Sequence, residues 1–168
     1  MSKNASAIPV PAWASAAGRI LLTTLKGPHA ASEAIDRNLI AERIYRYGWA
    51  YDERDCALFA DCFVGDAVWE GNVMGDAPVG PFVGREAIVE WNTGFWKKQS
   101  DQRRHIFTNV IVDDLTDSFA AAHAYLLLTS SFHSTMKPVT TGAYRILMVK
   151  EVDNWRIKRL TSSFDAAF

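Results

Sequence analysis

Residues 104–112 read RHIFTNVIV, and their side chains fall into two alternating sets, one ending in two valines and the other beginning with His105 and Phe107. A period of two is typical of a β-strand, whose successive side chains point to opposite faces of a sheet. Three further segments, at 118–133, 139–150 and 155–163, have the length and composition of strands, with turns expected at 136–138 and 152–154. The second half of the chain therefore predicts a run of antiparallel strands.

The residues before this run predict helices. Ser32 is a suitable N-cap for a helix over 32–51, whose apolar residues recur at helical period: Ile35, Leu39, Ile40, Ile44, Tyr47 and Tyr51. Asp55 can cap a second helix that Gly65 ends, with an apolar face of Leu58, Phe59, Cys62 and Phe63. A strand is expected at 67–73, a loop at 76–84 because it is rich in Gly and Pro, and a third helix at 85–98 with Ile88, Trp91 and Phe95 on one face.

Helices followed by strands indicate an α+β fold, in which a curved, mainly antiparallel sheet wraps around the helices. The chain has 168 residues, the size of one ordinary domain. We expect residues 31–168 to form that domain. Residues 1–30, rich in Ala, Ser and Pro, are expected to form a partly ordered arm with a short helix near 20–25.

Composition excludes several classes of protein. The 18 basic and 19 acidic residues give a net charge of −1, whereas proteins that bind nucleic acid usually carry a basic excess. No apolar stretch reaches transmembrane length. Cys56 and Cys62 lie too far apart on one helix for a disulfide, so both are interpreted as reduced core residues in a cytoplasmic protein.

Four local patterns carry a resemblance to a known family. They are Tyr51-Asp52-Glu53-Arg54-Asp55, Gly84-Arg85-Glu86-Ala87-Ile88, His105-Ile106-Phe107-Thr108-Asn109, and Gly142-Ala143-Tyr144 followed by Trp155-Arg156-Ile157. In this order they resemble the SnoaL-like branch of the nuclear transport factor 2-like superfamily, which includes scytalone dehydratase, lindane dehydrochlorinase and bile-acid dehydratase. The resemblance covers about residues 32–163.

The resemblance implies a cone-shaped sheet that encloses an apolar pocket, and an Asp–His catalytic pair in that pocket. Carried over by position, the pair is Asp52 and His105, with Tyr51 as a polar helper. Two departures concern the surroundings of the pair. A second catalytic tyrosine of scytalone dehydratase falls near Trp69–Gly71, where this chain has none, and two polar residues of its penultimate strand fall near Gly142 and Tyr144.

The residues themselves allow more than one role. A carboxylate beside an imidazole fixes its tautomer and makes it a general base, which can remove a proton from carbon. Loss of a leaving group then completes an elimination; without one, the same base isomerises or cyclises a ketone. Alternatively, Asp52 is a turn residue and His105 an ordinary strand histidine. The side chains expected to face the substrate are Tyr144, Trp69, Phe107, Asn109 and His123.

Other polar residues give weaker signals. No two histidines have metal-ligand spacing, so we expect no metal and no cofactor. His133 is expected to be exposed near a strand end. Four basic residues are interpreted as solvated sheet edges: Arg103, Arg104, Lys158 and Arg159. Trp49, Trp69, Trp91 and Trp96 are interpreted mainly as core.

The functional prediction is a cofactor-independent lyase of the scytalone dehydratase type that acts on a small, mostly apolar ring compound. The alternatives are a polyketide cyclase, a ketosteroid-type isomerase, or a non-catalytic subunit that binds a ligand or stabilises a partner. Apolar residues on both faces of the long strands, such as Leu126, Leu127 and Leu128, predict a homo-oligomer, a dimer or trimer packed through the outer face of the sheet. Gly48, one helical turn before Asp52, suggests that a substrate or a crossing strand needs space there.

Overall fold

The computed structural model describes residues 22–23, 31–152 and 154–168. Its helices are α2 (Ala31–Asp52), α3 (Cys56–Asp61) and α4 (Arg85–Trp96). Its strands are β1 (Phe63–Val73), β2 (Ala77–Val83), β3 (Gln102–Leu115), β4 (Phe119–Phe132), β5 (Thr135–Glu151) and β6 (Asn154–Phe164). Apart from residues 22–23, the predicted arm with its short helix lies outside the described residues.

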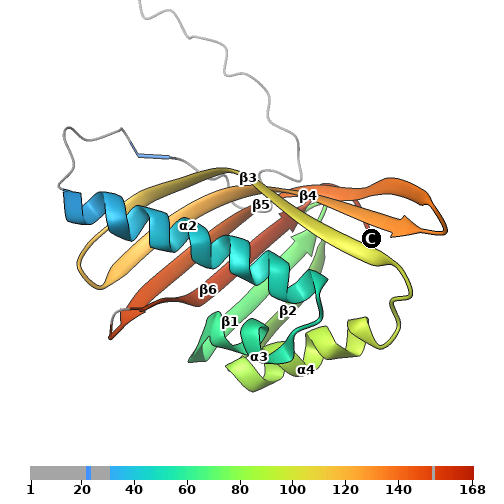
Figure 1. The fold of residues 1–168 in the computed structure, drawn as a ribbon, viewed down its shortest axis with the longest axis horizontal. Coiled ribbons are helices and arrows are strands. Elements are labelled where there is room, and N and C mark those ends of the chain that lie inside the picture. Colours follow the sequence, from blue (N-terminus) through green and yellow to red (C-terminus); the bar gives the residue numbers. More distant parts are fainter. Residues whose placement is uncertain (1–21, 24–30, 153) are drawn as a thin grey trace, which may run out of the picture.

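The six strands form one sheet in the order β2-β1-β6-β5-β4-β3. Every neighbouring pair is antiparallel except β1 and β6, which are parallel. The sheet curves around α2, which lies along its inner face, while α3 and α4 close the end near β1 and β2 (Figure 1). This is the α+β architecture that the change from helical to strand periodicity predicts.

Helix α2 is buried through the middle and end of its length. Ile40 and Ile44 are fully buried and Tyr47 nearly so, whereas Ile35 and Leu39 near the start are exposed. The expected apolar stripe therefore meets the core only from Ile40 onward. The helix also begins at Ala31, so Ser32 lies inside its first turn rather than at its N-cap.

A tight reversal joins α2 to α3. Arg54 has a left-handed φ of 56°, its N–H donates to the Tyr51 carbonyl, and the next N–H donates to the Ala50 carbonyl. These two bonds form the Schellman motif that ends many helices. The Asp55 side chain then accepts the Leu58 N–H at 2.9 Å and caps α3, as the sequence predicts. The helix ends at Asp61, so Phe63 and Gly65 belong to β1 and not to the helix.

Two expectations about the strands are wrong. Residues 77–83, expected as a loop, form β2, because an edge strand needs hydrogen bonds on one side only and tolerates its Gly and Pro residues. The turn expected at 136–138 lies instead at His133 and Ser134, which both adopt positive φ, 44° and 62°. Two successive positive φ values characterise the two-residue hairpin loop that suits twisted strands.

The core lies between α2 and the inner face of the sheet. Aromatic side chains dominate it, and its largest fully buried members include Trp155, Tyr144, Phe59 and Phe63. Trp69 and Trp96 are buried as expected, but Trp49 is 63% exposed on the outer side of α2. Cys62 is buried as expected, whereas Cys56, in the first turn of α3, is exposed.

Candidate functional site

Asp52 and His105 are in direct contact, although 53 residues separate them in sequence. The Asp52 Oδ1 atom lies 2.6 Å from His105 Nδ1, and Oδ2 accepts the His105 backbone N–H at 2.8 Å. Both side chains are almost fully buried, with 5% and 6% of their surface exposed. The carboxylate therefore holds the histidine by its ring and by its backbone at the same time.

This contact assigns the tautomer of the imidazole. An ionised carboxylate only accepts hydrogen bonds, so Nδ1 carries the proton and Nε2 has a free lone pair. None of the described residues hydrogen-bonds to Nε2. A histidine in this state can accept a proton through Nε2 while the carboxylate stabilises the resulting cation.

The fold places the two residues by separate means. Asp52 is the last residue of α2, where the helix dipole disfavours a negative charge, so the two hydrogen bonds from His105 offset an unfavourable position. His105 lies on β3, which crosses α2 at Gly48. A Cβ atom at Gly48 would lie 3.0 Å from Phe107 Cε2 and 3.2 Å from His105 Cβ, so this glycine allows the close crossing. The space beside Gly48, expected to hold a substrate or a crossing strand, is therefore filled by strand β3.

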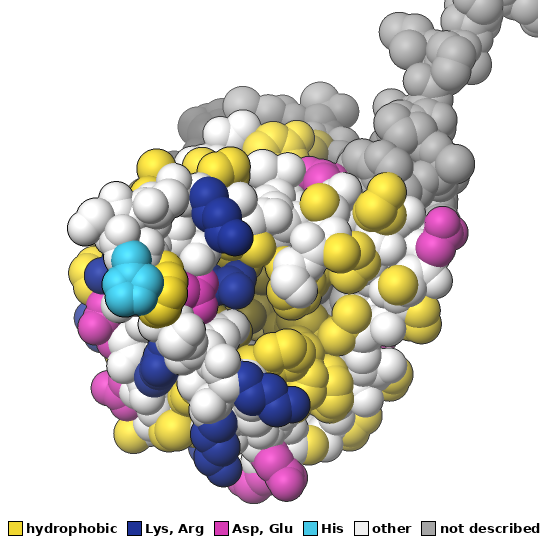
Figure 2. Space-filling view, turned by 90° about the vertical axis from the view of Figure 1, so that its right-hand side faces the viewer, with side chains coloured by type: hydrophobic (Ala, Val, Ile, Leu, Met, Phe, Trp, Pro, Cys, Tyr) yellow, Lys and Arg dark blue, Asp and Glu magenta, His cyan; other side chains and the backbone are white. Residues whose placement is uncertain are grey.

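A cavity of about 40 Å³ adjoins the pair. Besides His105, its walls consist mainly of aromatic and apolar side chains: Tyr47, Tyr51, Trp69, Trp91, Phe95, Leu128, Tyr144, Phe164 and Phe168, with Asn92, Gln99 and Arg103 as further polar members. Figure 2 looks onto the end of the molecule where the C-terminus lies and shows a hollow lined by hydrophobic side chains with basic side chains near its edge. The cavity has room for about one water molecule, so a ring compound can enter only if a wall residue moves.

Three tyrosines line this cavity. Burial raises the pKa of Tyr47, Tyr51 and Tyr144, so all three stay protonated near neutral pH. The Tyr51 ring packs against the His105 ring at 4.5 Å, and its hydroxyl accepts a hydrogen bond from Gln99 at 3.2 Å. Its proton therefore remains available for a ligand. The Tyr47 hydroxyl accepts the Trp69 indole N–H at 3.3 Å.

Three of the five residues expected to face the substrate do not line the cavity. Phe107 packs behind the wall, with its ring 5.2 Å from that of Tyr144. Asn109 is exposed because it forms a β-bulge with a left-handed φ of 51°, a conformation that asparagine tolerates well. The bulge reverses the alternation, so Val112 instead of Ile111 is buried. His123 lies near Asp113, at 3.9 Å, and not in the cavity. Tyr144 and Trp69 do line it.

Arg103, expected at a solvated sheet edge, instead lines the cavity, and only 18% of its side chain is exposed. The signal for this placement was present, because Arg103 has the same strand parity as His105. Phe164 and Phe168 had no comparable signal. Phe164 reaches the cavity through the pairing of β6 with β1 and β5, and Phe168 follows that strand and packs against Phe164 at 4.7 Å. Arg104, with the opposite parity, is exposed as expected.

A family model for the SnoaL-like domain matches residues 32–161. The chain belongs to the SnoaL-like family. No protein with a curated description matches the chain. The family shares the nuclear transport factor 2-like fold, which is known as a fold that binds small molecules.

Solved structures share the fold of this SnoaL-like domain. A variant of Rv3472 from Mycobacterium tuberculosis, a protein of unknown function, is 20% identical, with 83% of this chain and 78% of that chain covered and a TM-score of 0.70. A Catenulispora acidiphila protein in complex with S-DNPA is 26% identical over 78% and 94%, with a TM-score of 0.67. The β subunit of a putative aromatic-ring-hydroxylating dioxygenase from Novosphingobium aromaticivorans is 13% identical over 82% and 94%, with a TM-score of 0.69.

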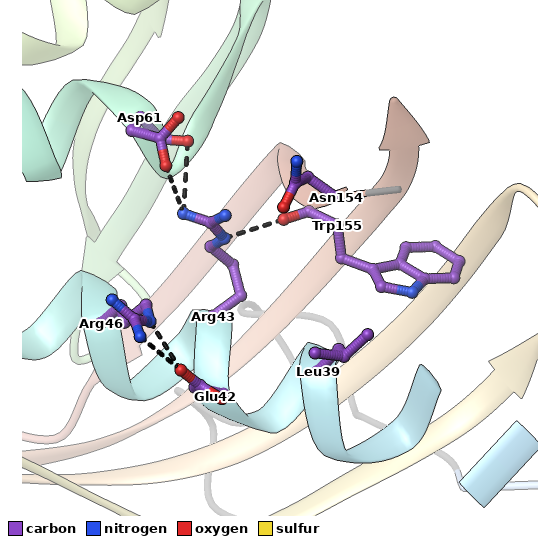
Figure 3. A pocket seen from close by; sticks show the side chains of 7 residues that line it. All are labelled: Leu39, Glu42, Arg43, Arg46, Asp61, Asn154 and Trp155. Carbon is purple, nitrogen blue, oxygen red and sulfur yellow. Dashed lines mark hydrogen bonds and ion pairs between the residues drawn. The ribbon is translucent and has the colours of Figure 1, made fainter. Parts of the chain in front are cut away.

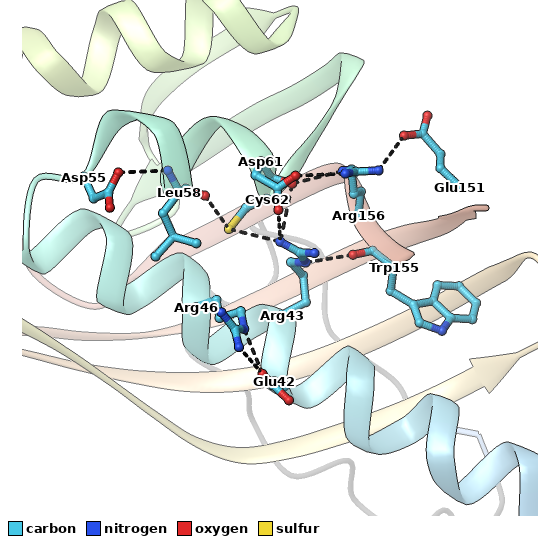
Figure 4. A network of polar contacts seen from close by, with 10 residues as sticks. All are labelled: Glu42, Arg43, Arg46, Asp55, Leu58, Asp61, Cys62, Glu151, Trp155 and Arg156. Atoms are coloured by element: carbon cyan, nitrogen blue, oxygen red, sulfur yellow. Dashed lines mark hydrogen bonds and ion pairs between the residues drawn. The ribbon is translucent and has the colours of Figure 1, made fainter. Parts of the chain in front are cut away.

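The SnoaL-like domain has a second, larger cavity of about 280 Å³ between α2, α3 and β6. There the Arg43 guanidinium donates to the Trp155 carbonyl at 2.8 Å and to Asp61 at 2.9 Å (Figure 3). Asp61 also pairs with Arg156 at 2.8 Å, and this hydrogen bond, followed by the one from Arg43, lowers the Asp61 pKa (Figure 4). The charges in this cavity neutralise one another in a structural network. The smaller cavity, which adjoins a histidine with a free lone pair, is therefore the candidate functional site.

Neither a metal cluster nor a membrane span is found in the described part of the SnoaL-like domain. No group of three His, Cys, Asp or Glu side chains within residues 22–23, 31–152 and 154–168 is placed to hold a metal ion. Among the helices that the structure describes, none is long and apolar enough to cross a membrane.

Proposed function

We propose that this SnoaL-like protein is a cofactor-independent, dehydratase-like lyase for a small, mostly apolar ring compound. The observation that carries the proposal is the buried 2.6 Å contact between Asp52 and His105 beside an aromatic cavity. Buried ionisable groups are costly, and this pair adds a carboxylate at the unfavourable end of a helix. A costly buried pair beside a cavity supports a functional role rather than a purely stabilising one.

In the proposed reaction, His105 Nε2 removes a proton from a carbon next to a carbonyl group. The C–H electron pair forms a C=C bond, and a hydroxyl group on the neighbouring carbon leaves. The proton taken up by His105 then converts the leaving hydroxide to water, which restores the base. If Tyr51 supplies that proton instead, the proton on His105 must pass to the Tyr51 phenolate to restore both groups. The aromatic walls exclude water and bind the ring, which supports an apolar substrate.

The same base supports a second outcome. If the ring carries no leaving group but a C=C bond beta to the carbonyl, the C–H electron pair forms a new C=C bond and the carbonyl π pair moves onto the oxygen, giving a dienolate. Reprotonation at the far end of the dienolate then isomerises the compound. The similarity to a complex with S-DNPA supports small-molecule binding in either case. A non-catalytic ligand-binding subunit stays an alternative, which the experiment below separates from an enzyme.

The proposal is tested by exchange of α-protons of small cyclic ketones in deuterium oxide, followed by proton NMR, with cyclohexanone and indanone as probes. We expect catalysed exchange by the wild type and a loss of about 10²–10⁴-fold in His105→Asn. His133→Asn is the matched control, because His133 is exposed in a hairpin loop whose positive φ asparagine tolerates. Exchange at the buffer rate with both ketones, or equal rates for the two variants, would contradict the proposal.

The outer face of the sheet supports the expected homo-oligomer. Ile106, Ile111, Tyr125 and Leu127, on β3 and β4, are each between 36% and 57% exposed. Apolar groups that lie together on a surface are typical of an interface. We propose a dimer or trimer through this face, which a monodisperse monomer in light scattering would exclude.

The two cysteines, both free, support the proposal of a reducing, cytoplasmic location.

A further inference from the structure

Arg103 is a charged residue in the otherwise aromatic surroundings of the cavity. It lies two residues before His105 on β3, on the same face of the strand, and lines the same cavity. The two Cα atoms are therefore about 7 Å apart along the strand. A single ring with one substituent spans a distance of this order, so one ligand can contact both side chains.

The Arg103 guanidinium is held in position from one end. Its Nε donates to Asp101 at 2.5 Å, and the same carboxylate oxygen accepts a short hydrogen bond from the buried Ser130 hydroxyl. Ser130 is the cross-strand partner of Arg103, and Arg54 fixes the loop by donating to the Asp101 carbonyl at 3.1 Å. Burial alone would raise the pKa of Asp101, but the bonds from Ser130 and Arg103 lower it, so this carboxylate stays charged.

The other end of the guanidinium has no such partner. Among the described residues, none accepts a hydrogen bond from the two terminal nitrogens of Arg103. Arg104 differs, because its terminal nitrogen pairs with Glu53 at 3.0 Å on the outer surface. Two unengaged donors at the edge of an apolar cavity favour a negatively charged oxygen, and a carboxylate can accept from both in two parallel hydrogen bonds.

We propose that Arg103 binds a ring-attached oxygen of the substrate that is negatively charged or becomes so when His105 removes a proton. For a ketone, His105 Nε2 takes the proton, the C–H electron pair becomes the C=C bond of an enolate, and the charge on the oxygen faces Arg103. This deepens the proposed function by specifying the substrate as a ring with an anionic or enolisable oxygen. The claim that Arg103 stabilises the enolate rests on the proposed function and is the catalytic half of this inference. The claim that Arg103 binds an anionic oxygen does not depend on the proposed function and is the binding half.

The binding half is tested with benzoate and benzamide, which have nearly the same shape but differ in charge, by isothermal titration calorimetry. We expect the wild type to prefer benzoate by about tenfold or more. Arg103→Met should abolish this preference, and Arg103→Lys should keep part of it. Arg104→Met is the matched control on the opposite face of the same strand and should keep all of it.

The variant His105→Asn separates this inference from the proposed function. The benzoate preference should persist there, since it depends on Arg103 and not on the base. Arg103→Gln serves as a second neutral variant if Arg103→Met does not fold. The inference is overturned if the wild type binds benzamide as tightly as benzoate, if it binds neither, or if a folded neutral variant keeps the preference. Suppose that His105→Asn abolishes ketone exchange, while Arg103→Met changes neither the exchange rate nor the benzoate preference. This result would overturn the role of Arg103 and leave the proposed function intact.

Discussion

Replacement of Gly48 by alanine tests how closely α2 and β3 must approach to bring Asp52 to His105. Alanine gains about 1 kcal/mol over glycine in a helix interior. The new Cβ atom, however, would lie 3.0 Å from Phe107 Cε2 and 3.2 Å from His105 Cβ. Both distances are shorter than the roughly 3.5–4.0 Å of a favourable carbon–carbon contact. Overpacking of this kind costs about 1–3 kcal/mol, so we expect a net loss of about 0–2 kcal/mol.

Gly94 provides a matched control in the interior of α4. A Cβ atom there would meet nothing within 4 Å, so Gly94→Ala should stabilise the protein by about 0.5–1 kcal/mol. Urea unfolding of both variants measures the difference between them, expected at about 0.5–3 kcal/mol. Phe107→Leu should relieve part of the cost of Gly48→Ala in the double variant. If Gly48→Ala stabilises as much as Gly94→Ala does, the crossing is looser than described and the reasoning fails.

Three further predictions concern other parts of the molecule. Arg43→Met should cost about 2–3 kcal/mol in urea unfolding, because it leaves the buried Trp155 carbonyl without its donor, whereas Arg46→Met, at an exposed pair, should change stability by less than about 0.5 kcal/mol. Equal losses would contradict a structural role for the first. Burial lowers the pKa of His123, the charge of Asp113 offsets part of this effect, and the charge of Arg145 lowers the pKa further. The stability that depends on the neutral form of His123 is therefore present above about pH 6.5 and is lost as the pH falls through the lower folded value. Urea midpoints at about pH 7.5 and about pH 5 should therefore converge in His123→Gln, and an unchanged pH dependence would count against this. Phe168→Ala removes an exposed wall residue and should tighten indanone binding severalfold with a stability change within about 0.5 kcal/mol; unchanged affinity in calorimetry would show that another residue controls entry.

The periodicity of the sequence was sufficient for the fold, because helices and strands of this length bury one face each. The prediction failed where the alternation of strand side chains between the two faces of the sheet is interrupted locally. The positive φ of Asn109 inserts one residue into β3 and reverses the alternation beyond it. The strand at 77–83 was missed because its Gly and Pro residues are typical of loops, and only its edge position makes a strand possible.

For the candidate site, the resemblance to the SnoaL-like family indicated Asp52, Tyr51 and His105, but it could not show what completes the cavity. The place of Phe164 depends on long-range strand pairing, and Phe168 packs against it. Arg103 had the correct parity, yet a basic residue at the start of a strand is more often solvated. Its burial depends on Asp101, which pairs with Arg103 and also accepts a hydrogen bond from Ser130. Ser130 lies on β4, so the sequence does not show that it meets Asp101.

The central claim is that Asp52 and His105 act as one unit, and a double-mutant cycle on ketone exchange tests it. An imidazole whose carboxylate partner becomes an amide loses its fixed tautomer and its stabilised cation, so Asp52→Asn should slow exchange strongly, within the range of about 10²–10⁴-fold for a positioned base. Circular dichroism and urea unfolding check that each variant keeps its fold.

The decisive measurement is the exchange rate of the double variant Asp52→Asn/His105→Asn. Residues that act as a unit are strongly non-additive, because the carboxylate has nothing to assist once the base is gone. We therefore expect the double variant to exchange cyclohexanone at the same rate as His105→Asn alone. If the two losses multiply instead, Asp52 and His105 contribute independently, and the account of a general-base dyad is contradicted.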